Sequence, residues 1–222
     1  MKRVLEIRAA EGGEDAKLFS RDLAQAYAKH FGRVGWKHRL TEQTDNISIE
    51  VEGPDLSALD SEPGGHRIQR VPPTERKGRV HTSTVTVAVI NSKAVSQVEF
   101  NKQDFKIEWY SGTGAGGQHR NKHQNSCRIT HTSGIVVTAQ CRSRENSLNE
   151  ARTTILERLN QTHQGQVSGE EAANRKKQVG SGMRGDKIRT YRFQDNTVKD
   201  HLTGKQAPVD KVMSGNFQLL WK

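Results

Sequence analysis

The sequence predicts an α+β protein made of more than one small domain, and three observations lead to this. Hydrophobic residues make up only 32% of the 222 residues, which suits small cores under large polar surfaces better than one deep core. Strand-like alternation and helical periodicity follow one another along the chain. The composition also changes near residue 100, where a nearly neutral part gives way to a basic one.

The first part of the chain reads as strands around one amphipathic helix. Residues 4–8 alternate like a strand that ends at two glycines. Apolar residues then recur every four positions and predict one buried helix face: Phe19, Leu23, Tyr27 and Phe31. Gly32 is the expected C-terminal cap. Further strands are expected at 46–52 and 83–90, with an extended loop and a helical turn over 61–79.

In the second part, a strand leads into a glycine-rich loop over residues 111–125. Residues 126–142 read as a hairpin, because polar and apolar residues alternate on both sides of a Ser-Gly turn. Ser147 is the expected cap of a helix whose inward residues are Leu148, Ala151, Ile155 and Leu159. A polar, basic tract follows from 160 to 190, and part of it is expected to be mobile.

The formal net charge is +10 at pH 7, and it is unevenly placed. Residues 1–100 hold 15 Lys and Arg against 14 Asp and Glu, whereas residues 101–222 hold 20 against 11. A solvated basic face would explain one cluster of cations. An imbalance confined to one part of the chain favours contact with nucleic acid instead.

The expected location follows from what the chain contains. No stretch approaches the roughly 18 apolar residues of a membrane helix, and Met1 leads directly into a strand-like segment rather than a signal or transit peptide. Cys127 and Cys141 are too few for a disulfide framework. We therefore expect a cytoplasmic protein with free thiols and no membrane partner.

The loop contains a literal GxGxxG pattern from Gly112 to Gly117. A dinucleotide site would next need a helix with an apolar face and an acidic residue roughly 20 positions on. Residues 119–125 have no apolar face, and the window around Val137 holds no acid, so we reject that interpretation. Closely spaced glycines let the backbone approach another surface, and the basic sequence beside them suits insertion into RNA. A flexible linker is the alternative, although it would not need Gln118 followed by two cations and two histidines.

Several residues near this loop raise the question of a metal site: His119, His123, His131, Cys127 and Cys141. No CxxC or HExxH spacing is present, and the hairpin pattern does not bring these side chains to one point. We therefore expect no metal ion and no cofactor. The sequence also shows no Ser-His-Asp or paired-carboxylate arrangement. If the protein promotes a reaction, we expect backbone positioning rather than a titrating base.

Residues 66–83 form a second candidate site. Pro72 and Pro73 fix φ at successive positions and hold the next side chain, Thr74, in place. Thr, Gln and His side chains can read base edges, and His can also stack on a purine. The ordinary alternative is that the prolines only form a turn before a strand. These residues alone do not decide between a base-reading loop and such a turn.

Together these motifs resemble those of bacterial and organellar class I peptide chain release factors, of the branch that reads UAA and UAG. Residues 110–119 look like the family's GGQ loop, and Pro72-Pro73-Thr74 is similar to its codon-reading PxT tripeptide. The segments 64–67 and 81–83 fall where the family has them, and residues 189–191 resemble the segment that joins its two domains. The resemblance covers nearly the whole chain.

The resemblance implies a domain arrangement and a set of site residues. Residues 1–99 and 186–222 would form a codon-recognition unit, and residues 100–185 a separate small α/β domain that carries GGQ. The residues that would promote hydrolysis are Gly116, Gly117 and Gln118, with Gln118 also a candidate for methylation. The residues that would recognise the stop codon are Gly12, Asp15, Gln69, Pro72, Pro73, Thr74, His81 and Thr82.

The chain also departs from the family's pattern. The family usually has an N-terminal helical domain before the first strand, and this chain is expected to lack it, which leaves open the contacts that domain makes with the ribosomal stalk base and the recycling GTPase. The family's first-base glutamate falls at Asp15, one methylene shorter, beside Glu14. Reading of the first base would then be weakened or carried by Glu14.

The function implied is a translation termination factor that binds the ribosomal A site at UAA or UAG and promotes hydrolysis of the peptidyl-tRNA ester. The ribosome would supply most of the active site, so the protein is better classed as a translation factor than as an enzyme. Its expected partners are ribosomal RNA, the mRNA stop codon, peptidyl-tRNA and a glutamine methyltransferase, and we expect a monomer. Two alternatives are a codon-independent rescue factor, which would usually dispense with residues 1–99, and a non-catalytic RNA-binding protein, against which the intact GGQ argues.

Overall fold

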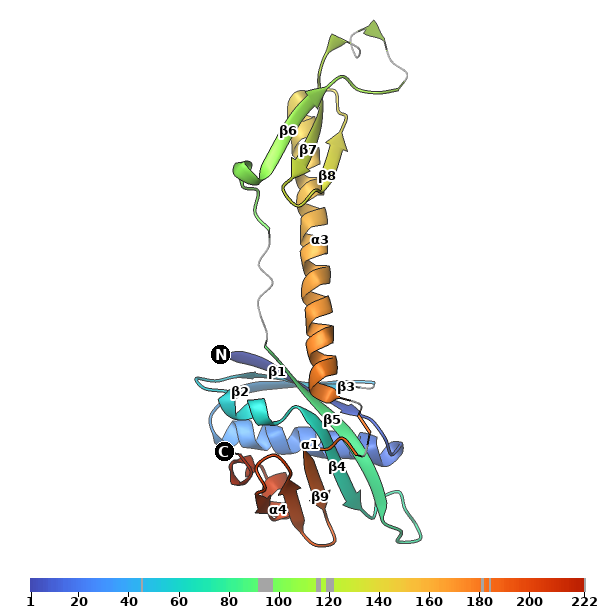
Figure 1. Ribbon diagram of the computed structural model, residues 1–222, viewed down its shortest axis with the longest axis vertical. Coiled ribbons are helices and arrows are strands. Elements are labelled where there is room, and N and C mark those ends of the chain that lie inside the picture. The colour runs from blue at the N-terminus through green and yellow to red at the C-terminus, as the bar shows by residue number, and fades with distance from the viewer. Residues whose placement is uncertain are drawn as a thin grey trace. The chain divides into compact units, whose positions relative to one another are not determined.

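The computed structural model describes residues 1–44, 46–91, 98–114, 117–118, 122–180, 182–183 and 185–221. It mixes helices and strands, as the sequence predicts, and it divides into two compact units (Figure 1). Unit 1 comprises Met1–Lys93 with Glu171–Lys222, and unit 2 comprises Ala94–Glu170. The sequence predicts boundaries after residues 99 and 185. Each lies further along the chain than the corresponding division in the structure, after Lys93 and after Glu170.

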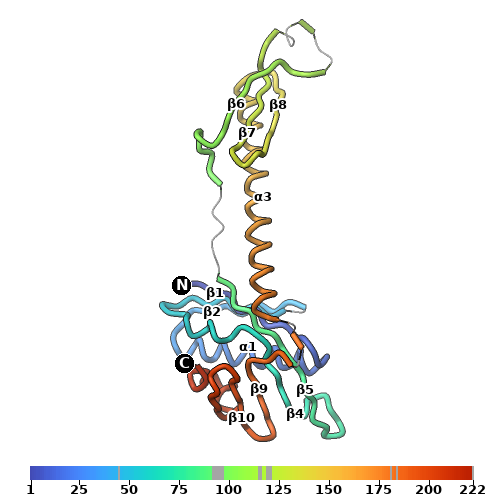
Figure 2. Tube along the Cα trace, viewed as in Figure 1, coloured from blue at the N-terminus to red at the C-terminus, as the bar shows by residue number. Residues whose placement is uncertain are grey.

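Among the described residues, unit 1 holds one eight-stranded sheet with the order β11-β10-β9-β4-β5-β1-β3-β2. Its strands are β1 (Lys2–Ala9), β2 (Lys37–Gln43), β3 (Asn46–Glu52), β4 (Gly64–Arg70), β5 (His81–Asn91), β9 (Arg189–Arg192), β10 (Thr197–Asp200) and β11 (Gln206–Ala207). Neighbouring strands are antiparallel except β4 and β9, which are parallel. The C-terminal part of the chain thus adds three strands to a sheet begun by the N-terminal part (Figure 2).

Helix α1 (Glu14–Arg33) packs along one face of this sheet (Figure 1). Its predicted apolar face is confirmed, because these four residues are fully buried: Phe19, Leu23, Tyr27 and Phe31. Burial of each such side chain stabilises the fold by about 1.5–3 kcal/mol. The expectation that Gly32 caps the helix is wrong, because Gly32 lies inside it. The chain turns instead at Gly35, whose φ of +74° favours glycine.

Two strands differ from the sequence prediction. The extended loop expected over 61–79 is wrong for residues 64–70, which form β4 between β5 and β9. Glycine at position 65 is a packing requirement, because an added Cβ would collide with the carbonyl oxygen of Asp186. Strand β2 was not expected, and all of its residues are exposed, so its sequence carries no buried alternation.

Unit 2 contains a three-stranded antiparallel sheet packed on the first part of α3 (Arg144–Val179). Its strands are β6 (Phe105–Tyr110), β7 (Ser126–His131) and β8 (Val136–Ala139). The predicted hairpin is confirmed, since Gly134 turns with a φ of +86° and its N–H donates to the His131 carbonyl at 2.9 Å. The buried core of this unit consists of Phe105, Cys127, Ile129, Val137, Ala139, Ala151, Ile155 and Leu159.

Helix α3 starts and ends differently from the prediction. Ser147 lies in the first turn, where its hydroxyl accepts the N–H of Cys141 at 2.8 Å, rather than at the cap. The polar tract expected from residue 160 is helical as far as Val179. The last turns pack on unit 1 itself: Arg175 donates to both carboxylate oxygens of Glu6 at 2.6 and 2.8 Å. For this reason the division between the units falls inside the helix.

A buried polar network holds the C-terminal segment in unit 1. Arg189 is fully buried and donates to the two oxygens of Glu62 at 2.8 Å each and to Asp200 at 2.9 Å. The Tyr27 hydroxyl and the Trp221 ring N–H also donate to Glu62. Because a buried charge is costly unless it is paired, this network fixes β9 and the final residues against α1. Short helices complete the units: η1 (Ser57–Ser61), η2 (Lys102–Asp104), α4 (Val209–Met213) and η3 (Phe217–Leu219).

Of the helices in the described ranges, none combines the length and apolar character that a membrane span requires.

Candidate functional site

The glycine-rich loop of unit 2 presents Gly117 and Gln118 at its surface. Both residues are exposed, whereas Gly116 and His119 lie outside the described residues. A methyl group added at Gly117 would meet no heavy atom within 4 Å, and its φ is not in the left-handed range. Neither crowding nor backbone strain in the isolated chain therefore requires glycine at this position.

The two ends of the loop are anchored within unit 2. At the first end, the Thr113 N–H donates to the Gln140 side-chain oxygen at 3.1 Å, and the Gln140 amide donates back to the Thr113 hydroxyl at 3.2 Å. At the second end, Arg144 donates to the Gln124 carbonyl at 2.9 Å. The Arg144 guanidinium lies over the Trp109 ring, 4.6 Å from its centroid. These contacts hold the base of the loop and let its tip project.

The charge around this loop has one sign. No acidic residue occurs between Glu108 and Glu145, and the same stretch holds five Lys and Arg. Such a segment suits an anionic surface such as RNA. Within the described residues, no group of three or more His, Cys, Asp or Glu could hold a metal ion.

In unit 1, the expected codon-facing residues meet where β4 ends and β5 begins. The antiparallel register pairs Gln69 with Thr82 and Arg70 with His81. Residues that are directly opposite share one face of a sheet, so Gln69 and Thr82 lie side by side, and both are half-buried. Their face is the one opposite the core, into which Ile68 points.

The start of α1 is locked onto the same strands. Gly12 has a φ of +121°, and an added Cβ would collide with the Ser83 hydroxyl and come within 2.8 Å of the Ser83 Cα. Asp15 is 3% exposed, and its two carboxylate oxygens accept from Arg70 Nε and from the Ser83 hydroxyl, both at 2.8 Å. Arg70 also donates to Asp22 at 2.8 Å. The Asp15 carboxylate is therefore turned into the protein, where it fixes the helix start against β4 and β5.

The proline tripeptide forms a tight turn. The Glu75 N–H donates to the Pro72 carbonyl at 3.0 Å, which places Pro73 and Thr74 at the corner. Pro72 is buried, whereas Pro73 and Thr74 are exposed. The turn thus leaves the Thr74 side chain exposed at its corner.

Glu75 organises this loop, although no motif in the sequence predicted a role for it. Its carboxylate accepts from the Lys77 N–H at 2.7 Å, from Arg79 at 2.9 and 3.1 Å, and from His81 Nε2 at 2.8 Å. These hydrogen bonds, led by that of the Lys77 amide, lower the pKa of Glu75 to about 2. Its role could have been inferred from the sequence, because Glu75 is a single acid beside Arg76, Lys77 and Arg79.

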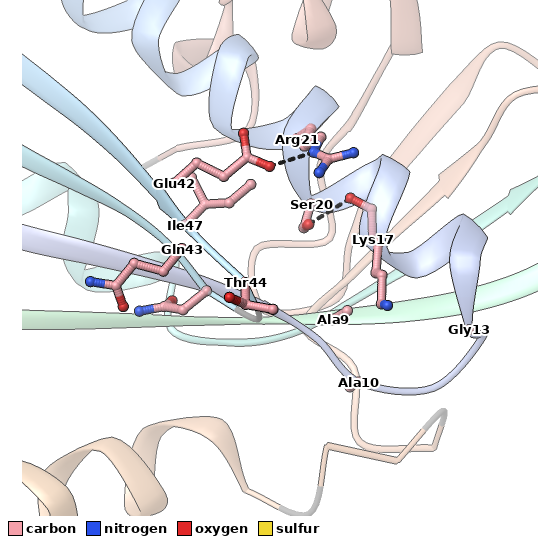
Figure 3. A pocket seen from close by; sticks show the side chains of 11 residues that line it. Ala9, Ala10, Gly13, Lys17, Ser20, Arg21, Glu42, Gln43, Thr44 and Ile47 are labelled. Carbon is pink, nitrogen blue, oxygen red and sulfur yellow. Dashed lines mark hydrogen bonds and ion pairs between the residues drawn. The ribbon is translucent and has the colours of Figure 1, made fainter.

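A pocket of about 260 Å³ opens beside the start of α1 (Figure 3). Gly13 and Lys17 line it from the helix side, and an ion pair between Arg21 and Glu42 at 2.6 Å closes one wall. The end of β2, the connection and the start of β3 contribute Gln43, Thr44 and Asn46. The pocket thus places the polar side chains of Lys17, Thr44 and Asn46 beside the start of α1.

A proline turn on one unit and an anchored glycine loop on the other define a class of protein, the peptide chain release factors. Residues 1–87 match the family described as the PCRF domain, and residues 93–202 match the RF-1 domain. The chain belongs to the peptide chain release factor family.

Relatives within this family are named peptide chain release factor 1. That of Carboxydothermus hydrogenoformans is 40% identical, over 96% of this chain and 63% of its own length. That of Nitratidesulfovibrio vulgaris is 39% identical, over 98% of this chain and 64% of its own length. The chain thus spans less than two thirds of the length of these relatives. Among solved structures, RF2 of Thermus thermophilus is similar, with a TM-score of 0.55 and 28% identity over 99% of this chain and 66% of that one.

Proposed function

We propose that the chain is a translation termination factor that recognises UAA and UAG in the ribosomal A site and promotes hydrolysis of the peptidyl-tRNA ester. The observation that carries the proposal is the presence of two exposed tips on one chain, the Thr74 turn in unit 1 and Gly117-Gln118 in unit 2. The relatives named peptide chain release factor 1 support it. Unit 1 is the codon-recognition unit under this proposal, and unit 2 is the unit that acts on the ester.

Codon recognition would use the end of the sheet where β4 leads into the proline turn and β5 begins, beside the start of α1. Thr74, Gln69 and Thr82 supply hydroxyl and amide groups that can read base edges, and His81 can stack on a base. Among the described residues no side chain caps α1, so the backbone N–H groups that follow Gly12 would be available to carbonyl oxygens of a uracil. Asp15 would act by holding this helix start in place.

Ester hydrolysis would depend on the backbone at the glycine tip. Gly116 and Gly117 would let the loop enter the ribosome's catalytic centre, and the Gln118 N–H would stabilise the oxyanion or the departing ribose oxygen. One such donor is typically worth about 3–4 kcal/mol, or roughly 100- to 1000-fold in rate. The Gln118 side chain would position water and exclude larger nucleophiles.

The partners under this proposal are ribosomal RNA, the mRNA stop codon and peptidyl-tRNA, in the cytoplasm and with the protein as a monomer. The exposed Gln118 amide is accessible to a glutamine methyltransferase. The basic stretch from residue 109 to 144 gives unit 2 the charge that a ribosomal RNA surface requires.

Peptide release from ribosomes programmed with UAA, UAG, UGA, a sense codon or an empty A site tests the proposal. We expect release at UAA and UAG only. Equal release on all five programmes would assign the chain to codon-independent rescue, and binding without release on any of them would make it a non-catalytic ribosome-binding protein.

A further inference from the structure

A second polar site lies on unit 1, on the face of the sheet opposite α1. A cavity of about 160 Å³ opens there across β4, β9, β10 and β11. The opposite face of the same strands packs on α1, where the rings of Phe19 and Tyr191 are 5.2 Å apart. The residues that line the cavity include Arg67, Thr190, Arg192, Lys199, His201 and Gln206.

Strand register assembles this cavity from distant parts of the chain. Arg67 of β4 pairs with Thr190 of β9, Thr190 pairs with Lys199 of β10, and Lys199 pairs with Gln206 of β11. Paired residues share one face, so these four form a continuous row across the sheet. Arg192 lies two residues beyond Thr190 and therefore points to the same side.

No acid occurs among the described residues that line the cavity, so these residues do not neutralise its positive charge. Arg67 Nε is buried and has no hydrogen-bond acceptor among the residues that the structure describes. Burial, and then the charge of Arg192, lower the pKa of Arg67. The ion pair from Arg192 to Asp195 is long, at 4.0 Å, and both side chains are exposed. Within the described part of the chain, Lys199 forms no ion pair.

His201 is affected by the positive charges of the same cavity. Its Nε2 lies 2.9 Å from the Thr190 hydroxyl. Burial lowers the pKa of His201, and the nearby charges of Lys187, Lys199 and Arg67 lower it further. The cavity thus offers guanidinium, ammonium and hydroxyl donors around one point, which is the donor set that a phosphate group prefers.

We propose that this cavity binds a backbone phosphate of RNA. The choice of RNA over a free anion comes from position: Gln69 lies two residues from Arg67 on the same face of β4 and pairs with Arg192 of β9. The cavity therefore adjoins a residue that would meet the codon, and in this respect the inference rests on the proposed function. A phosphate contact here would set the register of the RNA strand without reading its sequence.

The test compares two double variants of the full chain. Arg192→Gln with Lys199→Gln removes two exposed cations of the cavity, and Lys37→Gln with Arg39→Gln removes two exposed cations of β2 at the other end of the sheet. Each binds a fluorescent single-stranded RNA, and anisotropy gives the dissociation constant over a series of salt concentrations. We expect the cavity variant to bind about tenfold more weakly and its salt slope to fall by about one relative to the β2 variant. Equal dissociation constants and slopes for the two variants would overturn the proposal, as would absence of RNA binding by the unsubstituted chain.

A second arm separates RNA from free anions. Inorganic phosphate is titrated into the unsubstituted chain while NMR follows the Thr190 and Lys199 amides. Tight binding of phosphate there, with RNA binding unchanged in the cavity variant, would assign the cavity to a small anion and overturn the RNA proposal. The anisotropy assay needs no peptide release. If the unsubstituted chain binds RNA but releases no peptide, and the cavity variant binds RNA more weakly than the β2 variant, the proposed function is wrong and this site is supported.

Discussion

Glu75 Oε2 accepts a hydrogen bond from His81 Nε2 at 2.8 Å, and this bond joins the proline turn to the first residue of β5. The same carboxylate accepts two bonds from Arg79, so one half-buried acid closes the loop that carries Thr74. Thr74 and His81 are thereby held in a fixed relation, which a codon-reading surface needs before the RNA arrives.

Glu75→Gln should weaken codon-dependent release. The substitution removes the charge that Arg79 and His81 share and leaves one acceptor oxygen, so the turn should sample more conformations. We expect the concentration of protein for half-maximal release at UAA to rise about tenfold, with the maximal rate nearly unchanged. Arg76→Gln in the same loop is the matched control, and similar release curves for the two variants would refute a positioning role for Glu75.

Asp15→Ala should destabilise unit 1 far more than Asp22→Ala, although both residues accept from Arg70. Asp15 is buried and its loss leaves Arg70 Nε and the Ser83 hydroxyl without their acceptor, which should cost about 2–4 kcal/mol. The Asp22 side chain is 45% exposed, so its loss should cost less than about 1 kcal/mol. Urea unfolding of both variants measures the difference. Equal losses would show that burial does not set the value of this pair.

Gly117→Ala should leave the fold intact and abolish most release. The added methyl group has open space in the isolated chain, so the free energy of unfolding should change by less than about 0.5 kcal/mol. On the ribosome the same methyl group would displace the Gln118 N–H, and release should slow by roughly 100-fold or more. Gln118→Ala keeps that N–H and should slow release only modestly. Near-wild-type release by both variants would contradict the backbone mechanism.

Unit 1 should lose stability in mild acid. Burial, and then the charge of Arg189, lower the pKa of His66 to about 4 from its ordinary value of 6.5. Between these values the unfolded chain binds a proton that the folded chain excludes. The free energy of unfolding should therefore fall as pH falls through this window, by up to about 3 kcal/mol from His66 alone. Burial lowers the pKa of His30 and of His201 in the same direction. Urea unfolding measured from about pH 7 to about pH 5 checks this, with His66→Gln as the comparison. An equally steep pH dependence in that variant would show that His66 is not the source.

The sequence predicted the elements that depend on patterns among neighbouring residues. The helix over 14–33 could be predicted because its apolar residues repeat every four positions, and the two exposed tips could be predicted from short motifs. Strand β4 was not predicted, because side chains at positions 64 and 65 would collide with Ile188 and Asp186, which are far along the chain. The Asp15 contacts with Arg70 and Ser83 join residues 55 and 68 positions apart, so no local pattern announced them.

Codon-dependent release is measured as the rate of peptidyl-tRNA hydrolysis on ribosomes that carry UAA in the A site. The comparison is the rate on ribosomes that carry a sense codon. At saturating protein, we expect release at UAA to be about 100-fold faster or more, a discrimination of roughly 2.7 kcal/mol. Equal rates on the two codons, or no hydrolysis on either, would contradict it.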